Sequence, residues 1–270
     1  MKNVLVLLSV IALLFMTACN EAKDSPKGEA NAQKKTLRLA CVAYNEPEVQ
    51  AGVKALEGMG YKVEVIVLQN ATIMFEALDN NEIDASLHAH KPWTDSYNNT
   101  KSKNIVMLMP YIHKNVFGMF STRHKNVSEI KECASIAIPQ DESNMGRSLF
   151  LLQELGFIKL KSGVTNPTDI DIESNIKKIE ITKLDAQQVI SAIRDVDAVC
   201  NAKLYLVSNK VTDYTELAQS GDLDKFGVGF TVANVNKDAP WTRDLIKAYT
   251  SEEVRGVINA LYKGGSVPGF

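Results

Sequence analysis

The chain has 270 residues, of which 45% are hydrophobic and 23% are charged, and its formal net charge is −2. This composition argues against a disordered chain, and the near-neutral charge argues against a nucleic-acid-binding protein. At the start of the chain, Lys2 precedes a run over residues 4–15 that is apolar except for Ser9. That run is shorter than the ~20 residues needed to cross a bilayer, so residues 1–18 are predicted to be a signal peptide.

Small residues directly before Cys19 resemble the lipobox of bacterial lipoproteins, in which the cysteine is lipidated and becomes the mature N-terminus. An uncleaved anchor and a soluble secreted protein are the alternatives. The residues that follow are polar, so residues 19–34 are predicted to be a lipidated, flexible tether. We therefore expect a protein held by the lipid on Cys19 at the extracytoplasmic side of a cell membrane.

The body of the chain alternates short apolar runs with amphipathic stretches, which predicts an α/β protein with parallel sheets. Cys41 and Cys200 lie in predicted strands and are expected to be small core residues, with no disulfide framework. Strands are expected near residues 37–44, 63–67, 83–87, 105–110, 116–121, 136–139, 179–181, 196–200 and 227–232. Helices are expected near residues 49–56, 73–78, 149–155, 185–194 and 254–261.

Residues 135–156 carry the clearest signal of a binding site. They begin with a short apolar run, which predicts a buried parallel strand. Apolar residues at helical spacing start at Leu149, and Gly156 is expected to end that helix in a left-handed conformation. Either Asp141 or Ser143 is expected to cap the start of the helix.

The first turn of this helix has the features of a small-anion site. We expect the backbone N–H groups of residues 144–146 to be free, and Gly146 leaves room for a ligand beside the backbone. Arg147 lies one turn into the helix, and a guanidinium can bind a carboxylate through two parallel hydrogen bonds. The alternative is that Arg147 is a solvated surface residue and Asn144 an ordinary cap.

Several segments, in chain order, resemble the methionine-binding lipoprotein family, the substrate-binding subunits of methionine-type ABC importers. The matching segments are residues 76–85 with His90-Lys-Pro-Trp93 (family "aLndGelDan…QHKPy"), residues 138–153 ("iPNDptNxGRaLlLLQ"), residues 155–164 ("aGLIkLkdGv"), and residues 251–254 and 263–270 at the C-terminus. Together these motifs are specific, and they cover essentially the whole mature chain.

The resemblance implies an α/β, two-lobed periplasmic-binding-protein fold with a hinge and an interlobe cleft. Lobe I would comprise residues 35–122 and 226–270, and lobe II would comprise residues 123–225. The ligand would lie between the lobes, where open α/β sheets usually bind. The implied partners are a small amino acid or dipeptide ligand and the permease and ATPase of an importer, with no cofactor and no enzymatic activity.

By the same resemblance, Arg147 and Asn144 match the family residues that take the α-carboxylate of the ligand. Asn201 matches the asparagine that holds the polar end of the amino acid, and His90 matches the histidine of the "QHKP" motif. An asparagine amide both donates and accepts hydrogen bonds, which suits a zwitterion.

Other pocket positions depart from the family pattern. Leu87-His88-Ala89 replace aromatic residues before the "QHKP" motif, and residues 225–228 lack a second asparagine. The resemblance therefore supports an amino-acid-like carboxylate more strongly than it supports methionine. The residues proposed to rebuild an aromatic-lined pocket are Tyr44, His88, Trp93 and Phe226.

Two further readings stay open from the sequence. His88 and His90 share one face of a predicted strand, but a metal site needs more ligands, so a polar role in the cleft is expected for them. The altered pocket also leaves an alternative to amino-acid import: a lipid-anchored surface protein or enzyme on the same scaffold. The chain contains no G-x-S-x-G motif, no H-E-x-x-H motif and no P-loop.

Overall fold

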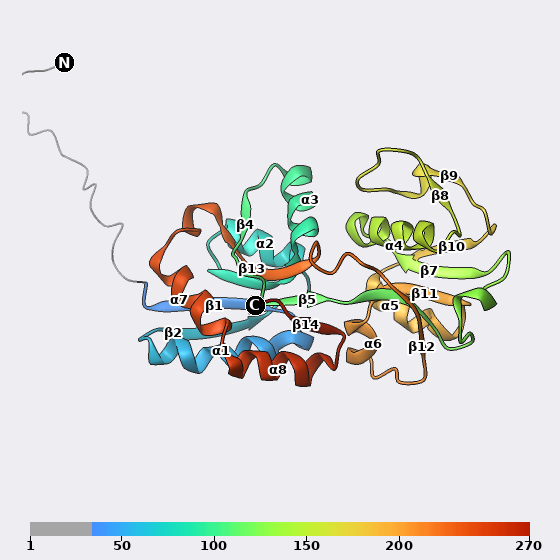
Figure 1. Cartoon of the computed structure of the whole chain (residues 1–270). Helices are drawn as coiled ribbons and strands as arrows, with labels where there is room; N and C mark the ends of the chain where they lie inside the picture. The colour runs from blue at the N-terminus through green and yellow to red at the C-terminus, as the bar shows by residue number, and fades with distance from the viewer. Residues whose placement is uncertain (1–33) are drawn as a thin grey trace, which may run out of the picture. The chain divides into compact units, whose positions relative to one another are not determined.

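The computed structural model describes residues 34–270, which form two α/β lobes, each built on its own sheet (Figure 1). The predicted signal peptide, the lipidation site at Cys19 and the tether up to residue 33 lie outside the described residues. None of the helices described over residues 34–270 is long and apolar enough to cross a membrane.

The first lobe is built on a seven-stranded mixed sheet. Its strands are β1 (Thr36–Cys41), β2 (Lys62–Val67), β3 (Ala85–His90), β4 (Ile105–Met107), β5 (His113–Asn115), β13 (Gly227–Ala233) and β14 (Ser266–Pro268). The order is β14-β5-β13-β3-β1-β2, with β4 paired to β13. The parallel pairing expected from the sequence holds among β1, β2 and β3, whereas β13 runs antiparallel to its neighbours.

Side chains that alternate along β1 explain why helices cover both faces of this sheet. Leu37 and Leu39 join the core beneath one helical layer, and Ala40 joins the core beneath the other. The first layer consists of α1 (Glu46–Gly58), α7 (Pro240–Tyr249) and α8 (Glu252–Tyr262), and the second of α2 (Ala71–Asp79) and α3 (Lys91–Lys101). Complete burial of a leucine stabilises the fold by ~1.5–3 kcal/mol, so β1 is a major part of the core.

The second lobe is built on a five-stranded mixed sheet. Its strands are β6 (Phe117–Ser121), β7 (Ser135–Pro139), β10 (Glu180–Leu184), β11 (Ala198–Ala202) and β12 (Thr215–Gln219), and its helices are α4 (Glu142–Glu154), α5 (Ala186–Ser191) and α6 (Leu204–Ser208). The order is β10-β7-β11-β6-β12. Strand β7 pairs in parallel with β10 and β11, which confirms the buried parallel strand predicted there. A separate two-stranded sheet joins β8 (Lys159–Leu160) to β9 (Ile172–Ser174).

The chain passes between the two sheets twice. It leaves the first sheet after β5, and only Val116 separates β5 from β6 of the second sheet. It returns through residues 220–226, between β12 and β13. The strand at residues 117–121, which we expected in lobe I, therefore belongs to the second lobe. An extended chain needs no turn to continue from one sheet into the next, so the sequence carries no break at Val116.

Both ends of α4 agree with the sequence. Asp141 is the N-cap, because its Oδ1 accepts a hydrogen bond from the backbone N–H of Asn144 at 3.0 Å. Gly156 follows the helix with φ of +74°, a backbone conformation that favours glycine. Strand β7 and helix α4 thus present residues 140–147 at the end of the strand.

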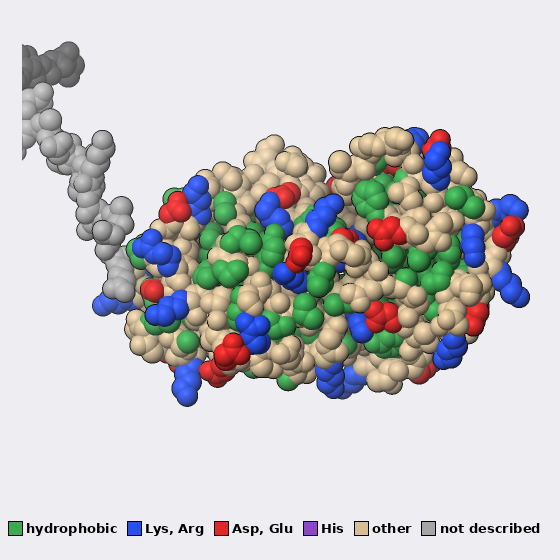
Figure 2. Space-filling model, in the orientation of Figure 1, with side chains coloured by type: hydrophobic (Ala, Val, Ile, Leu, Met, Phe, Trp, Pro, Cys, Tyr) green, Lys and Arg blue, Asp and Glu red, His purple; other side chains and the backbone are tan. Residues whose placement is uncertain are grey.

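Charged side chains of both signs are mixed on the visible surface. Figure 2 shows Lys and Arg interspersed with Asp and Glu over this face of residues 34–270. The mixture gives this face no continuous basic area of the kind that attracts nucleic acid.

Candidate functional site

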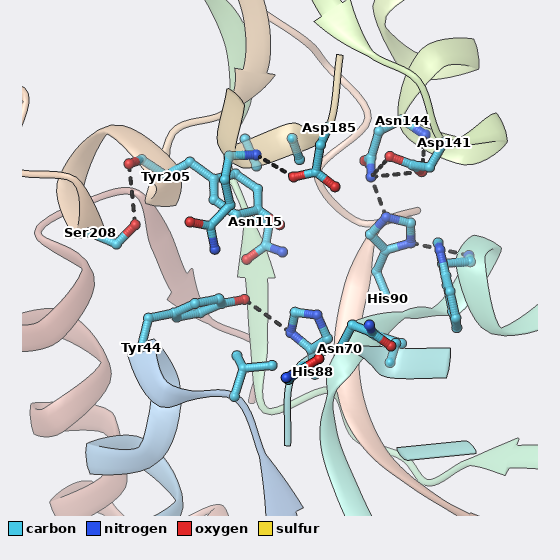
Figure 3. A pocket seen from close by; sticks show the side chains of 18 of the residues that line it. Tyr44, Asn70, His88, His90, Asn115, Asp141, Asn144, Asp185, Tyr205 and Ser208 are labelled. Carbon is cyan, nitrogen blue, oxygen red and sulfur yellow. Dashed lines mark hydrogen bonds between the residues drawn. The ribbon is translucent and has the colours of Figure 1, made fainter. Parts of the chain in front are cut away.

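A cavity of about 690 Å³ lies between the two lobes (Figure 3). The first lobe lines it with residues at and after the ends of β1, β2 and β3, and the second lobe with residues after β7, β10 and β11. The carboxyl ends of parallel strands from both sheets therefore converge on one space, which is where open α/β sheets bind ligands. We refer to this cavity as the cleft.

Six of the eight predicted ligand-binding residues line the cleft. They are Tyr44, His88, His90, Trp93, Asn144 and Arg147. The first four come from the first lobe and the last two from α4 of the second lobe. Side chains that are far apart in the sequence thus line one cavity between the two lobes.

The other two predicted residues lie outside the cleft. Asn201 is 1% exposed, and it is engaged inside the second lobe: its amide nitrogen donates to the carbonyl of Ala186 at 2.7 Å, and its Oδ1 accepts from the N–H of Ala202 at 2.8 Å. Phe226 packs behind the cleft, with its ring centroid 5.1 Å from that of His90. Neither side chain faces the cleft in this conformation.

The start of α4 is not the open anion site that we expected. The N–H of Asn144 donates to the Asp141 carboxylate, and the N–H of Met145 donates to the Asp141 carbonyl at 2.8 Å. The space beside Gly146 is also occupied, because a Cβ placed there would lie 2.8 Å from Oδ1 of Asn166. The cap therefore takes the amide of Asn144, and the first helical hydrogen bond takes the amide of Met145.

Arg147 is neither solvated nor free. Only 2% of the surface of Arg147 is exposed. The central carbon of its guanidinium lies 4.5 Å from the ring centroid of Phe117 and 4.1 Å from that of Phe226. Its Nε donates to both carboxylate oxygens of Asp222 at 2.9 Å, and its Nη2 donates to Asp222 and to the carbonyl of Asn115. Within the described residues its Nη1 is buried and has no hydrogen-bond partner. Nη1 is thus the one nitrogen of the guanidinium without an acceptor among the described residues.

His90 joins the two lobes across the cleft. Its Nδ1 accepts the N–H of Trp93 at 3.2 Å, so the proton lies on Nε2, which donates to Oδ1 of Asn144 at 3.3 Å. Burial, with the nearby Arg147 charge, lowers the pKa of His90 to about 3, although the bond to Asn144 acts in the opposite direction. His90 is therefore neutral throughout the physiological pH range.

His90 should make the fold sensitive to mild acid. Its pKa is below the unfolded value of about 6.5, so below that pH the unfolded chain binds a proton that the folded chain does not. Between pH 8 and pH 5 this removes about 2 kcal/mol of stability. His90→Asn, whose side chain still caps α3, should remove that part of the pH dependence of urea unfolding. An unchanged slope in His90→Asn would contradict the assignment.

Aromatic side chains from both lobes meet at one wall of the cleft. The hydroxyl of Tyr44 lies 3.1 Å from Nδ1 of His88, and the rings of Tyr44 and Tyr205 meet edge to face with centroids 6.2 Å apart. Burial lowers the pKa of His88 to about 4 and raises the pKa of Tyr44. Both side chains are therefore uncharged near pH 7.

Sequence reasoning missed several residues of the cleft wall. Those labelled in Figure 3 are Asn70, Asn115, Asp185, Tyr205 and Ser208. Asn70 and Asp185 could have been predicted from the sequence as helix caps. Asn70 accepts a backbone N–H at the start of α2, and Asp185 accepts one at the start of α5. Asn115 and Tyr205 carry no local signal, since only the pairing of the two lobes brings them here. No group of three or more His, Cys, Asp or Glu side chains within residues 34–270 is placed to hold a metal ion.

The profile of the NlpA lipoprotein family matches residues 38–270. The "D-methionine-binding lipoprotein MetQ" of Salmonella typhi is 33% identical over 97% of this chain and 96% of its own length.

Two solved structures share the fold. A nutrient binding protein from Burkholderia cenocepacia, bound to methionine, is 31% identical with a TM-score of 0.79 over 87% of this chain and 100% of that chain. An ABC transporter periplasmic substrate-binding protein from Coxiella burnetii is 26% identical with a TM-score of 0.79 over 86% of this chain and 99% of that chain. The expected two-lobed periplasmic-binding-protein fold is thus confirmed, and the chain belongs to the NlpA lipoprotein family.

Proposed function

We propose that this protein is an extracytoplasmic substrate-binding lipoprotein of an ABC importer, which captures methionine, a related amino acid or a short peptide in the cleft. The observation that carries the proposal is the unpartnered Nη1 of Arg147, the one cation that lines the cleft among the described residues. A buried N–H of a guanidinium is a strong donor for a carboxylate. The likeness to a protein that was solved with methionine bound supports this assignment.

The walls of the cleft suit the polar end and the side chain of an amino acid ligand. Neutral polar side chains such as Asn115 and Gln140 can exchange hydrogen bonds with the polar end of the ligand. Tyr44, Trp93 and Tyr205 provide aromatic surface for an apolar side chain. A cavity of about 690 Å³ lies within the usual range for small-molecule sites, ~300–1,000 Å³.

The interlobe contacts supply a mechanism for capture. Besides the bond between His90 and Asn144, the Ser96 hydroxyl donates to the Glu142 carboxylate at 2.9 Å, and both contacts join α3 or its cap to the start of α4. A ligand that contacts both lobes would stabilise this closed arrangement relative to an open one. The closed form would then be the state presented to the importer.

Membership of the family supports the proposed partners and location. Substrate-binding proteins of ABC importers deliver their ligand to a permease that is driven by an ATPase, and lipid on Cys19 would hold this one at the membrane. Relatives described as substrate-binding proteins favour import over the alternative of a surface protein or enzyme.

A thermal-shift panel of L- and D-amino acids and short peptides tests the proposal. A ligand present at about 100 times its Kd stabilises the folded state by about 2.7 kcal/mol. For a chain of this size that corresponds to a rise in Tm of roughly 5–10 °C. We expect methionine or a close relative to give such a rise. If no amino acid or peptide raises Tm, and mass spectrometry finds none copurifying, the proposal is wrong.

A further inference from the structure

The cation expected to bind the ligand's carboxylate already holds a carboxylate of its own chain. Asp222 accepts hydrogen bonds from Nε and Nη2 of Arg147, the two N–H groups that form one edge of the guanidinium. Its side chain is 25% exposed and lies on the return crossing between β12 and β13. A ligand carboxylate therefore finds only Nη1 free.

Asp222 contacts Arg147 from outside the cleft. It lines a second cavity of about 620 Å³, together with parts of α3 and α4, and it does not line the cleft. Arg147 lines both cavities and Asp222 only the second, so Arg147 lies between Asp222 and a ligand in the cleft. The two carboxylates would share one cation.

The remaining charges of the cleft do not compensate for Asp222. No lysine lines the cleft among the described residues, and its two other formally charged residues are Asp141 and Asp185. Two carboxylates that share one site with a single cation repel each other, and burial strengthens the repulsion. The free energy of binding a ligand carboxylate at Nη1 is therefore reduced by the negative charge of Asp222.

We propose that Asp222 is a specificity-determining residue: an internal counter-ion that weakens the hold of the cleft on ligand carboxylates. The inference rests on the proposed function, because it assumes that the ligand binds beside Arg147. The guanidinium does not depend on Asp222 alone for its position, since the rings of Phe117 and Phe226 and the carbonyl of Asn115 also hold it. Removing the charge should therefore strengthen carboxylate binding without displacing the cation.

Asp222→Asn removes the charge while keeping the size of the side chain and one acceptor oxygen. By titration calorimetry at pH 7, we expect this variant to bind L-methionine about tenfold more tightly than the wild type. Binding of L-methioninamide, which has no carboxylate, should not become tighter. The matched control is Asp224→Asn, two residues away, because the Asp224 side chain is 89% exposed and pairs with Lys114 instead.

Two more variants keep the result interpretable. Asp222→Glu retains the charge and should show no tenfold gain, and Asp222→Ser is a second way to remove the charge if Asp222→Asn folds poorly. If the wild type binds methionine and neither charge-removing variant binds it more tightly, the role of Asp222 is wrong and the proposed function stands. If only the charge-removing variants bind, the inference is supported. If neither the wild type nor the variants bind any ligand of the panel, both proposals fail.

Discussion

Replacing Arg147 with alanine is expected to weaken binding of a carboxylate ligand by roughly 2–5 kcal/mol, a loss of about 30- to 5,000-fold in affinity. The variant removes the one cation among the described residues that line the cleft. It also leaves the Asp222 carboxylate without its partner, so the site becomes repulsive toward a second carboxylate. Titration calorimetry with the ligand that gives the largest thermal shift measures the effect.

Controls separate this loss of binding from a loss of folding. Arg147→Lys keeps the charge but cannot reproduce the planar fork, so its affinity should lie between those of the wild type and the alanine variant. Arg194→Ala removes an exposed arginine that pairs with Asp213 in the second lobe, and it should leave affinity unchanged. If Arg147→Ala is folded at the temperature of the titration and binds as tightly as the wild type, Arg147 does not contact the ligand.

Local signals were sufficient to predict the strand and helix that deliver Arg147. The apolar run of β7, the cap at Asp141 and the left-handed Gly156 each depend on neighbours within a few residues. The burial of Cys41 and Cys200 was predicted from the same kind of local pattern. Both cysteines are buried in strands, and burial raises the pKa of each thiol to about 12. Short-range periodicity and capping therefore fix most of the elements.

The environment of Arg147 could not be predicted because its partners are distant in the sequence. Asp222 is 75 residues away, and it meets the guanidinium only because the return crossing passes beside α4. The prediction of free amides at the start of α4 was wrong for a different reason. The Asp141 carboxylate caps the helix by accepting the N–H of Asn144, so the residue that marks the helix start also removes a donor that a ligand would need.

Short strands at the crossing explain the error in the lobe boundary. Strand β5 spans only His113–Asn115, too few residues to show a period, and β6 follows after a single residue. The sequence therefore reads as one apolar strand at residues 116–121 rather than as two strands in different sheets. Strand pairing, which decides the lobe, is a property of the folded chain.

A buried network beside this crossing should be the most sensitive part of the first lobe. Glu48 of α1 is 0% exposed: its Oε1 lies 2.7 Å from Nδ1 of His113, and its Oε2 accepts the hydroxyl of Tyr262 at 2.6 Å. The network thus ties α1 and α8 to β5, the strand that leads into the second lobe. Glu48→Ala is expected to lower the free energy of unfolding by roughly 3–5 kcal/mol, because it leaves both partners buried without their acceptor.

Urea unfolding at pH 7, with and without ligand, measures this effect. Glu57→Ala, at an exposed glutamate of the same helix, should change stability by less than about 0.5 kcal/mol. Tyr262→Phe removes one donor and should cost about 1–3 kcal/mol, since it leaves one buried oxygen of Glu48 unsatisfied. A Glu48→Ala variant as stable as Glu57→Ala would show that water or repacking replaces the network. In that case β5 would be held by its strand pairing with β13 and β14 alone.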